Sequence, residues 1–434
     1  MSNNGKVENF ISGSWSSFPK KAPPPRMKLY TSPSFYSQAL FEILTGRYLK
    51  GQDIEKIEDT LVSYFQVPHA LTMPTARVGI YFVLRSIIKP GQKVILSPYT
   101  IADVINMVVC AGGVPVFADI DRETCNINPA EIEKLIDKDT GAVLVTHFYG
   151  LTCEIEKISE ICARYKVPLI EDAAQALGAK VGGKLVGTFG QASIFSFGLY
   201  KNVNSFLGGA ILTQDQQLYD VLRKEIATLP LQPPLPYLKK MFKGLITDIA
   251  TQKYLFRFFT FWIFRYAFLN NIGVLNNQLK IDTNPKLKKK IPIDYLVRMT
   301  PLQARLILHQ WANIERDTAQ RIKAAEIYDA GLRDLKELIL PPLRIDGSHL
   351  YTYYPIQYDQ RLELVRYASL HYRDIAESHH RNCANLPCFQ EYARSCPNAE
   401  ETARTLIYLP TYPSYGLKEV EKNVRMIRNF FGAS

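Results

Sequence analysis

Short apolar runs alternate with helical stretches through the first half of the chain. The runs are rich in Val, Ile, Leu and Ala and lie near 70–73, 94–97, 113–120, 142–146, 167–172, 192–197 and 210–213. Between them, apolar positions recur every three or four residues, as in 129–136 and 154–165. The runs have the length of buried strands, and strands that alternate with helices form a mostly parallel sheet covered on both faces. The pattern therefore predicts an α/β large domain.

Helical spacing also marks the segments on either side of this domain. It extends from Pro33 to Phe65 and resumes from Pro292 to Leu332. Beyond residue 341, a strand over 350–358 and helices over 362–377 and 417–431 predict a small C-terminal α+β domain. Residues 1–30 contain four prolines among lysines and lack the pattern of a secretory signal, so we expect a flexible lead-in and no export.

Two polar side chains follow strands of the predicted sheet and indicate one cofactor. Lys201 lies between the runs 192–197 and 210–213, and Asp172 ends the run 167–172. Open α/β sheets bind ligands at the carboxyl ends of their strands. A lysine there can bind a carbonyl covalently, and a carboxylate can keep a pyridine nitrogen protonated. A lysine alone would more often have no catalytic role, but the pair suits pyridoxal phosphate.

The segments around both residues resemble those of a known family. Residues 170–179 (IEDAAQALGA) and 195–202 (FSFGLYKN) are similar to segments of the DegT/DnrJ/EryC1/StrS family of pyridoxal-phosphate-dependent sugar aminotransferases. The likeness covers about 44–215 and resumes from 292 to near the C-terminus. It implies the type I fold of pyridoxal-phosphate transferases, with a mostly parallel seven-stranded sheet in a large domain and a small C-terminal domain.

The resemblance also implies a reaction. Lys201 would hold the cofactor and then move protons as base and acid, while Asp172 keeps the ring nitrogen protonated. A lysine at this position implies transamination, since the family members that dehydrate sugars carry histidine there. The amino donor would be glutamate, the acceptor a keto sugar, and the enzyme a homodimer.

Four more positions are candidate cofactor ligands. Thr75 and Ala76 begin an apolar helix, where free N–H groups favour a phosphate, although a Thr there is more often a simple N-cap. Tyr99 would stack on the pyridine ring by resemblance, and as a lone aromatic residue it would more often belong to the core. The resemblance further implies that Ser196 binds the phosphate and that Gln175 lies near the ring oxygen.

Three positions depart from the family's pattern. The phosphate turn contains Pro74, Leu207 stands where an acidic residue is expected, and Leu296 stands where relatives carry an asparagine that reaches the partner subunit's cofactor. These changes leave an alternative open, in which the chain is a catalytically silent relative that acts as a membrane scaffold in glycan or lipid assembly.

The segment 221–290 does not follow the family and carries most of the positive charge. The chain has a formal net charge of +11, and 231–290 holds eleven Lys and Arg against two Asp. Its aromatic centre, 254–269, is shorter than the roughly 20 residues that span a bilayer. Aromatic residues flanked by cations are typical of an element that lies on an anionic membrane surface. An arm packed on the dimer partner is the alternative, and nucleic acid is disfavoured because so continuous an aromatic stretch would not stay exposed.

Composition and spacing set the remaining expectations. A chain with 47% hydrophobic and 21% charged residues is globular. No metal site is predicted, because the cluster of His379, His380, Cys383, Cys388 and Cys396 lacks the close pairs of a zinc site. We expect a lead-in (1–30), a large cofactor-binding domain (31–220), a basic aromatic insertion (221–290), and a long helix with the small domain (291–434). The enzyme would lie on the inner face of the cell membrane and act on a nucleotide-linked or lipid-linked keto sugar.

Overall fold

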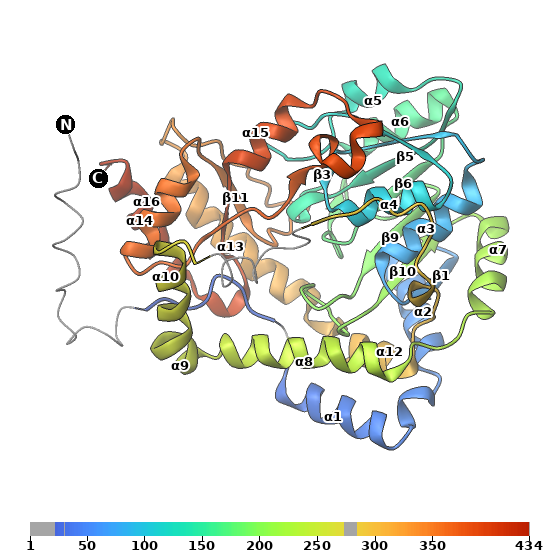
Figure 1. The fold of residues 1–434 in the computed structure, drawn as a ribbon, viewed down its shortest axis with the longest axis horizontal. Helices are drawn as coiled ribbons and strands as arrows, with labels where there is room; N and C mark the ends of the chain where they lie inside the picture. The colour runs from blue at the N-terminus through green and yellow to red at the C-terminus, as the bar shows by residue number, and fades with distance from the viewer. Residues whose placement is uncertain (1–21, 30, 273–283, 434) are drawn as a thin grey trace.

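A seven-stranded sheet forms the centre of the computed structural model, which describes residues 22–29, 31–272 and 284–433 (Figure 1). The strands, in spatial order, are β1 (His69–Met73), β10 (Gly209–Thr213), β9 (Ala192–Ser196), β6 (Leu169–Asp172), β5 (Thr140–Thr146), β2 (Lys93–Leu96) and β4 (Val114–Phe117). Strands β9, β6, β5, β2 and β4 pair in parallel, and β10 is antiparallel to both of its neighbours. The predicted mostly parallel α/β sheet is confirmed.

Helices bury both faces of this sheet, which explains why its strands are continuous apolar runs. One face packs on α3 (Ala76–Ile87), α4 (Ala102–Cys110) and α7 (Gln216–Ala227). The other face packs on α2 (Asp53–Phe65), α5 (Pro129–Leu135), α6 (Ile155–Tyr165) and α12 (Pro301–Gln310). The carboxyl ends of β5, β6 and β9 lie side by side, since Thr146 pairs with Asp172 and Asp172 with Ile194.

The C-terminal part forms a smaller unit around a three-stranded sheet. Its sheet has the order β11 (Tyr354–Gln357), β14 (Leu406–Leu409) and β12 (Ala376–Glu377), and its helices are α13 (Ile314–Leu332), α14 (Arg361–Leu370), α15 (Pro397–Thr405) and α16 (Leu417–Phe430). The predicted helix over 362–377 is wrong at its end. Helix α14 stops at Leu370, and residues 376–377 pair with β14 instead.

Several short elements connect these units. Two-residue strands pair as β3 (Tyr99–Thr100) with β13 (Arg381–Asn382) and as β7 (Lys180–Val181) with β8 (Lys184–Leu185). The 3-10 turns are η4 (Arg47–Leu49), η5 (Phe148–Gly150), η7 (Ile293–Tyr295), η8 (Trp311–Asn313), η9 (Cys383–Asn385), η10 (Pro387–Tyr392) and η11 (Pro413–Tyr415). The β3–β13 pair joins the small C-terminal unit to the large one.

The basic aromatic segment is a helical excursion whose two ends meet. It contains α8 (Pro234–Ala250), α9 (Lys253–Leu255), the π-helical turn η6 (Phe256–Thr260) and α10 (Phe261–Leu269). The N–H of Gln232 donates to the carbonyl of Arg298 (2.9 Å), and the N–H of Arg298 donates to the carbonyl of Pro230 (2.9 Å). In the part of the chain that the structure describes, no helix is both long and apolar enough to cross a bilayer.

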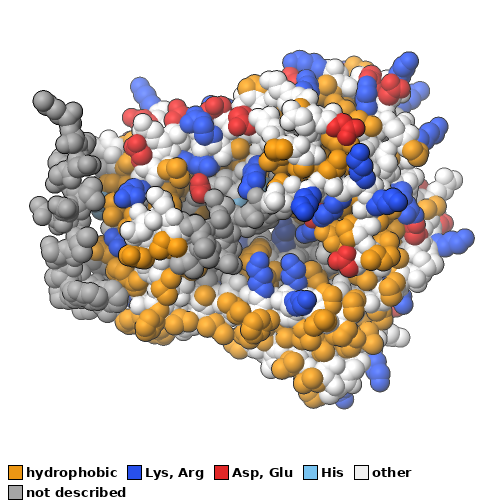
Figure 2. All heavy atoms as spheres, in the orientation of Figure 1, with side chains coloured by type: hydrophobic (Ala, Val, Ile, Leu, Met, Phe, Trp, Pro, Cys, Tyr) orange, Lys and Arg blue, Asp and Glu red, His pale blue; other side chains and the backbone are white. Residues whose placement is uncertain are grey.

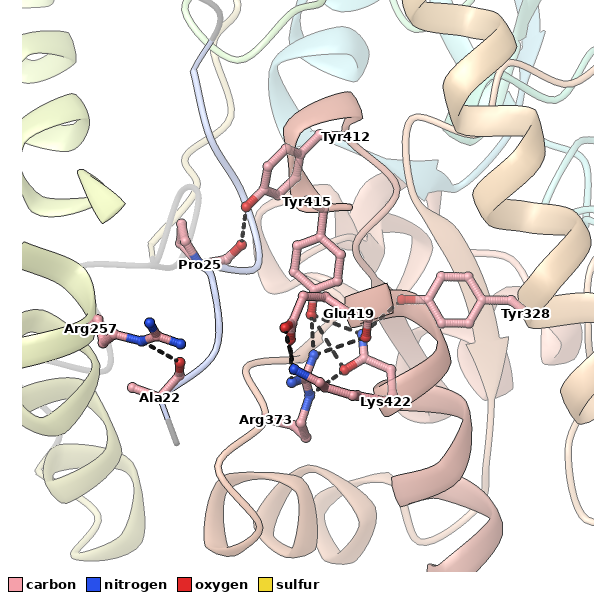
Figure 3. Close-up of polar contacts among 10 residues, drawn as sticks. Ala22, Pro25, Arg257, Tyr328, Arg373, Tyr412, Tyr415, Glu419 and Lys422 are labelled. Carbon is pink, nitrogen blue, oxygen red and sulfur yellow. Dashed lines mark hydrogen bonds and ion pairs between the residues drawn. The ribbon is translucent and has the colours of Figure 1, made fainter. Parts of the chain in front are cut away.

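The end of the N-terminal segment lies against both the excursion and the small unit (Figure 3). The Pro25 carbonyl accepts a hydrogen bond from the Tyr412 hydroxyl (2.7 Å), and the Arg257 side chain donates to the Ala22 carbonyl (3.3 Å). Most of the predicted flexible lead-in, residues 1–21 and 30, lies outside the described residues. Helix α1 (Pro33–Leu44) follows and packs beside α8.

Candidate active site

Lys201 and Asp172 come together at the carboxyl edge of the sheet. Asp172 ends β6, and Lys201 lies in the loop between the neighbouring β9 and the reversed strand β10. The Lys201 N–H closes a turn onto the Gly198 carbonyl (3.0 Å). Burial lowers the pKa of the Lys201 amine, and the charge of Asp172 opposes this shift. The loop therefore presents a lysine that loses its proton more readily than one in water, which is what attack on a carbonyl requires.

The Asp172 carboxylate is held in place by short-range contacts. It accepts hydrogen bonds from the Ala174 N–H (3.1 Å) and the Thr146 hydroxyl (3.4 Å), and its side chain is buried. Burial raises the pKa of Asp172, while the hydrogen bond from Ala174 and the charge of Lys201 oppose this shift. A buried carboxylate of this kind gains most from a cationic partner, such as a protonated ring nitrogen.

A second buried pair, which the sequence analysis missed, fixes the end of β6. Glu171 is fully buried and accepts hydrogen bonds from the N–H groups of Gly187, Phe189 and Gly190 at 2.7–2.8 Å. Its carboxylate also lies 3.3 Å from Nε2 of His147, whose Nδ1 accepts from the Cys153 N–H (3.0 Å). Because Nδ1 is an acceptor, Nε2 carries the proton and donates to Glu171. This network orients β6 and with it the neighbouring Asp172.

Thr75 provides a hydroxyl with no partner at the start of α3. It occupies the N-cap position by its backbone, yet its side chain makes no capping bond. Its buried Oγ1 has no hydrogen-bond partner among the described residues. Ala76 begins the helix, and the Ser196 hydroxyl, at the end of β9, accepts a long hydrogen bond from the Gly198 N–H (3.4 Å). The Thr75 and Ser196 hydroxyls can still donate hydrogen bonds, and they lie beside the N–H groups at the start of α3. Such a set of donors suits an anion such as a phosphate.

Gln175 lies one turn beyond Asp172 and braces an unusual backbone conformation. Its Oε1 accepts a hydrogen bond from the N–H of Tyr149 (3.2 Å). Tyr149 has a φ of 56°, in the left-handed region that costs a side-chain-bearing residue free energy. The Gln175 amide oxygen thus helps to hold the turn after β5 in place.

Tyr99 belongs to a buried network of hydroxyls and a histidine. Its hydroxyl lies 2.8 Å from that of Tyr149 and 3.0 Å from that of Ser378. The Tyr408 hydroxyl, in turn, lies 2.8 Å from both Ser378 and His380 Nδ1. Tyr99 is fully buried, so the structure shows a core contact for it, and stacking on a cofactor ring stays a prediction.

His379 and His380, which do not fit a zinc site by spacing, lie close enough to Lys201 for its charge to affect both imidazoles. Burial and, to a smaller extent, the charge of Lys201 together lower the pKa of His379 to about 4. The pKa of His380 is lowered by the same burial and by both neighbouring charges. Both imidazoles are therefore neutral near pH 7 and can accept or donate hydrogen bonds. No spacing in the sequence marks them, because they enter this site from the small unit.

Arg321 connects the long helix α13 to the loop between β9 and β10, which contains Lys201. It is buried and donates to the carbonyls of Tyr351 (3.2 Å) and Thr352 (3.0 Å) and to Asn202 Oδ1 (2.9 Å). Since Asn202 follows Lys201 directly, this guanidinium restrains the position of the lysine.

A family model covers nearly the whole chain. Residues 35–428 match the model described as the DegT/DnrJ/EryC1/StrS aminotransferase family. The chain belongs to this family. It is an aminotransferase, and the resemblance seen in the sequence is confirmed.

Individual relatives agree with this assignment. The spore coat polysaccharide biosynthesis protein SpsC of Bacillus subtilis is 26% identical over 404 residues, which cover 90% of this chain and 93% of that protein. GDP-perosamine synthase of Vibrio cholerae is 33% identical over 172 residues, or 39% of this chain and 47% of that protein. In fold, the aminotransferase resembles Helicobacter pylori PseC, an aminotransferase involved in pseudaminic acid biosynthesis (TM-score 0.70, 21% identity, 95% and 98% coverage).

The positions that depart from the family pattern have structural roles in this aminotransferase. The Leu207 carbonyl accepts hydrogen bonds from the Gln303 amide (2.7 Å) and the Ser205 hydroxyl (2.8 Å), so its backbone holds the loop between β9 and β10 on α12. Leu296 packs against the main core of the large domain. Pro74 is buried and leads directly into Thr75, whose hydroxyl remains available.

Proposed function

We propose that this aminotransferase uses pyridoxal phosphate to move an amino group from glutamate to a keto sugar. The observation that carries the proposal is the position of Lys201, whose lowered pKa and neighbour Asp172 suit covalent binding of a carbonyl cofactor. Bound there, pyridoxal phosphate would supply an electron sink for the carbon that loses its proton. The Lys201 amine, once released, would take and return that proton.

The surrounding residues would hold the cofactor by complementary chemistry. Asp172 would pair with the protonated ring nitrogen, and Gln175 would lie beside the ring oxygen. The Thr75 hydroxyl, the N–H groups at Ala76 and the Ser196 hydroxyl would bind the phosphate, which the unpartnered Thr75 Oγ1 supports. Tyr99 would contact the ring from the network that it shares with His380.

The relatives support a sugar as the amino acceptor. Their names include a GDP-perosamine synthase and a spore coat polysaccharide biosynthesis protein. We infer a keto sugar that is linked to a nucleotide or to a lipid, and an active homodimer as the working unit. A catalytically silent scaffold, the alternative left by the sequence, is disfavoured because Lys201 and Asp172 are present and lie together.

The visible absorption spectrum of the purified protein tests this function. We expect a band of covalently bound cofactor that disappears on addition of glutamate, and a keto sugar should then restore it. Lys201→Ala should lack the covalent band, whereas Lys180→Ala, at an exposed lysine of β7, should keep it. A wild-type protein that shows no band even after addition of pyridoxal phosphate would overturn the proposal.

The excursion and α1 together expose a large apolar surface, which we call the apolar platform. Figure 2 shows it as a continuous band along the edge formed by α10, α9, α8 and α1. Leu44 is 77% exposed, Phe242 61% and Phe259 62%. The platform comprises Leu40, Phe41 and Leu44 on α1, Leu235, Phe242, Ile246 and Ile249 on α8, Tyr254 on α9, Phe258 and Phe259 in η6, and Ile263 and Tyr266 on α10. A patch of this extent on a protein surface indicates a binding surface.

We infer that the apolar platform rests on an anionic membrane, on the cytoplasmic face. Cations are interleaved with it, since Lys239 shares a helix face with Phe242 and Ile246. The one carboxylate of residues 234–269, Asp248, is engaged by the hydroxyls of Tyr36 and Thr31. Pairing with a second copy would therefore oppose like charges, whereas each cation near an anionic surface is stabilised by about 1 kcal/mol.

Cosedimentation with vesicles tests the membrane proposal. Binding should require phosphatidylglycerol in phosphatidylcholine vesicles, and Phe242→Ser with Phe259→Ser should weaken it at least about tenfold, because each buried Phe contributes about 2 kcal/mol. Val221→Ser, at an exposed residue of α7 outside the platform, is the matched control. If the double variant leaves vesicle binding intact but dissociates a dimer on size exclusion, the platform pairs with a second copy instead.

A further inference from the structure

Helix α8 presents three faces with different chemistry. Tyr237, Met241 and Gly244 are buried. Phe242 and Ile246 lie on the side of the apolar platform. The remaining side carries Lys240 and Lys243, which are exposed and share a face because they are three residues apart. Among the described residues, neither lysine forms an ion pair with a carboxylate, so both charges are available.

The buried face of α8 packs against the loop between β9 and β10, which contains Lys201. A Cβ built at Gly244 would lie 2.9 Å from Leu199 Cδ1 and 3.3 Å from the Phe206 ring, so any larger side chain would displace these neighbours. Phe206 also contacts the Tyr237 ring, with centroids 5.7 Å apart. Helix α8 is thus packed on the loop that contains Lys201, two residues beyond Leu199.

The lysine face of α8 turns toward the same site. The Lys243 ammonium lies 6.0 Å from the ring centroid of Tyr200, which precedes Lys201. Although Lys240 as a whole is exposed, its ammonium is partly shielded from water, which lowers its pKa, and the charges of Lys243 and Arg77 act in the same direction. Arg77 follows Thr75 and Ala76 in α3, at the predicted phosphate end of the cofactor site. In Figure 2, blue side chains gather over α8 just above the apolar platform, beside a hollow in the surface.

Positive charge is in excess around this opening. Arg77 and Lys288 share one carboxylate, Asp103, with the Lys288 ammonium 2.5 Å from it. Lys240 and Lys243 add two further charges that no described carboxylate neutralises. One glutamate carboxylate would not balance such a group, whereas a diphosphate carries more than one negative charge and lysines are common phosphate ligands.

We propose that Lys240 and Lys243, together with Arg77, bind the diphosphate of the sugar substrate at the mouth of the site. This inference rests on the proposed function, because it names the group through which the keto sugar is linked. The diphosphate could belong to a nucleotide or to a polyprenyl carrier. Lys240 and Lys243 lie on the same helix as part of the apolar platform, so a lipid-linked diphosphate could reach them from a membrane surface.

Calorimetry on the cofactor-loaded enzyme tests the site with inorganic pyrophosphate as the minimal probe. Lys240→Gln and Lys243→Gln should each raise the Kd for pyrophosphate by about tenfold, as expected for loss of a charge-assisted contact. Lys239→Gln removes the same charge from the platform side of the same helix and should change the Kd less than about twofold. GDP and a short-chain polyprenyl diphosphate in detergent then identify the carrier, which should bind more tightly than pyrophosphate.

Two results would overturn the inference. One is equal weakening by all three substitutions, which would reflect general charge and not a site. The other is loss of cofactor affinity with unchanged pyrophosphate binding, which would assign the lysines to the cofactor phosphate. The loss of the absorption band on addition of glutamate does not depend on a diphosphate. If pyrophosphate does not bind at the lysines but the band still responds to glutamate, the proposed aminotransferase reaction stands and only the diphosphate site is refuted. If the band is absent, the proposed reaction itself is refuted.

Discussion

Replacing Arg373 should measurably destabilise the small C-terminal unit. Its side chain is only 7% exposed and makes four hydrogen bonds (Figure 3). It donates to Asn423 Oδ1 (2.6 Å), the Glu419 carboxylate (2.7 Å), the Tyr415 hydroxyl (2.9 Å) and the Glu419 carbonyl (3.0 Å). Arg373→Met keeps the apolar stem of the side chain and removes all four bonds. The residue joins α16 to the segment that leads into β12 and His380.

The expected loss of unfolding free energy depends on the hydrogen bonds that the partners of Arg373 still make after the substitution. Removing one member of a buried ion pair costs about 3–5 kcal/mol. Glu419 retains the Lys422 ammonium (2.6 Å) and is 21% exposed, so water relieves part of its unpaired charge. Asn423 Oδ1, which loses Arg373, retains the Tyr415 hydroxyl (3.4 Å), and Asn423 Nδ2 keeps its bond to the Tyr328 hydroxyl (2.8 Å). We therefore expect the lower end of the range, a decrease of about 3 kcal/mol in the free energy of unfolding.

Urea unfolding followed by circular dichroism measures this loss. Glu419→Gln keeps an acceptor for Arg373 and should cost only about 1 kcal/mol. The double variant should lose at least about 1 kcal/mol less than the sum of the two, because both remove the same interaction. A loss below about 1 kcal/mol for Arg373→Met, or strictly additive costs, would show that this cluster is not coupled as the structure indicates.

Three other changes test the active site. Asp172→Asn removes the charge that holds the Lys201 pKa up, so the pH midpoint for covalent cofactor binding, measured by absorbance, should move to lower pH. Thr75→Val should leave the stability of the cofactor-free protein within about 0.5 kcal/mol and weaken cofactor binding about tenfold, because the hydroxyl has no hydrogen-bond partner to lose in the described part of the chain. Gly244→Leu should displace α8 from the loop that contains Lys201. Because that displacement would misplace the lysine, kcat for sugar amination should fall at least about tenfold.

Controls separate these effects from general damage. Asp248→Asn alters a carboxylate of α8 that contacts Tyr36 and should not shift the pH midpoint. A Thr75→Val protein with unchanged cofactor affinity would remove this hydroxyl from the phosphate site. Gly183→Leu, at an open position in the β7–β8 turn, costs backbone strain without touching α8, so equal loss of activity would refute the contact argument.

The core of the site was predictable because it follows from chain-local patterns. Apolar runs locate the strands, and the carboxyl ends of parallel strands meet at one edge, which brings Asp172 to Lys201. The pairing of His147 with Glu171 was not predictable in this way. It depends on the parallel register of β5 and β6, in which Val145 lies opposite Glu171, and that register is a tertiary property.

Contacts between residues that are far apart in the sequence were also not predicted, because they too depend on the tertiary structure. Ser378 reaches Tyr99 across 279 positions of sequence, and Arg321 reaches Asn202 across 119. The apolar platform was expected from residues 231–290 alone, but α1 contributes Leu44, its most exposed member. Sequence spacing showed that both segments are amphipathic or aromatic; only packing shows that they share one edge.

The backbone hydrogen bonds of Pro230 and Gln232 with Arg298 bring the two ends of the excursion together. The described helices α8, α9 and α10 and the turn η6 lie between these two points and contribute no strand to the central sheet, so a short turn could close the same gap without changing the order of its strands. A gene could gain, lose or exchange such a unit in one event, because the register of the sheet does not depend on its length. The surface that the excursion presents can therefore change while the strands on either side of Asp172 and Lys201 keep their order.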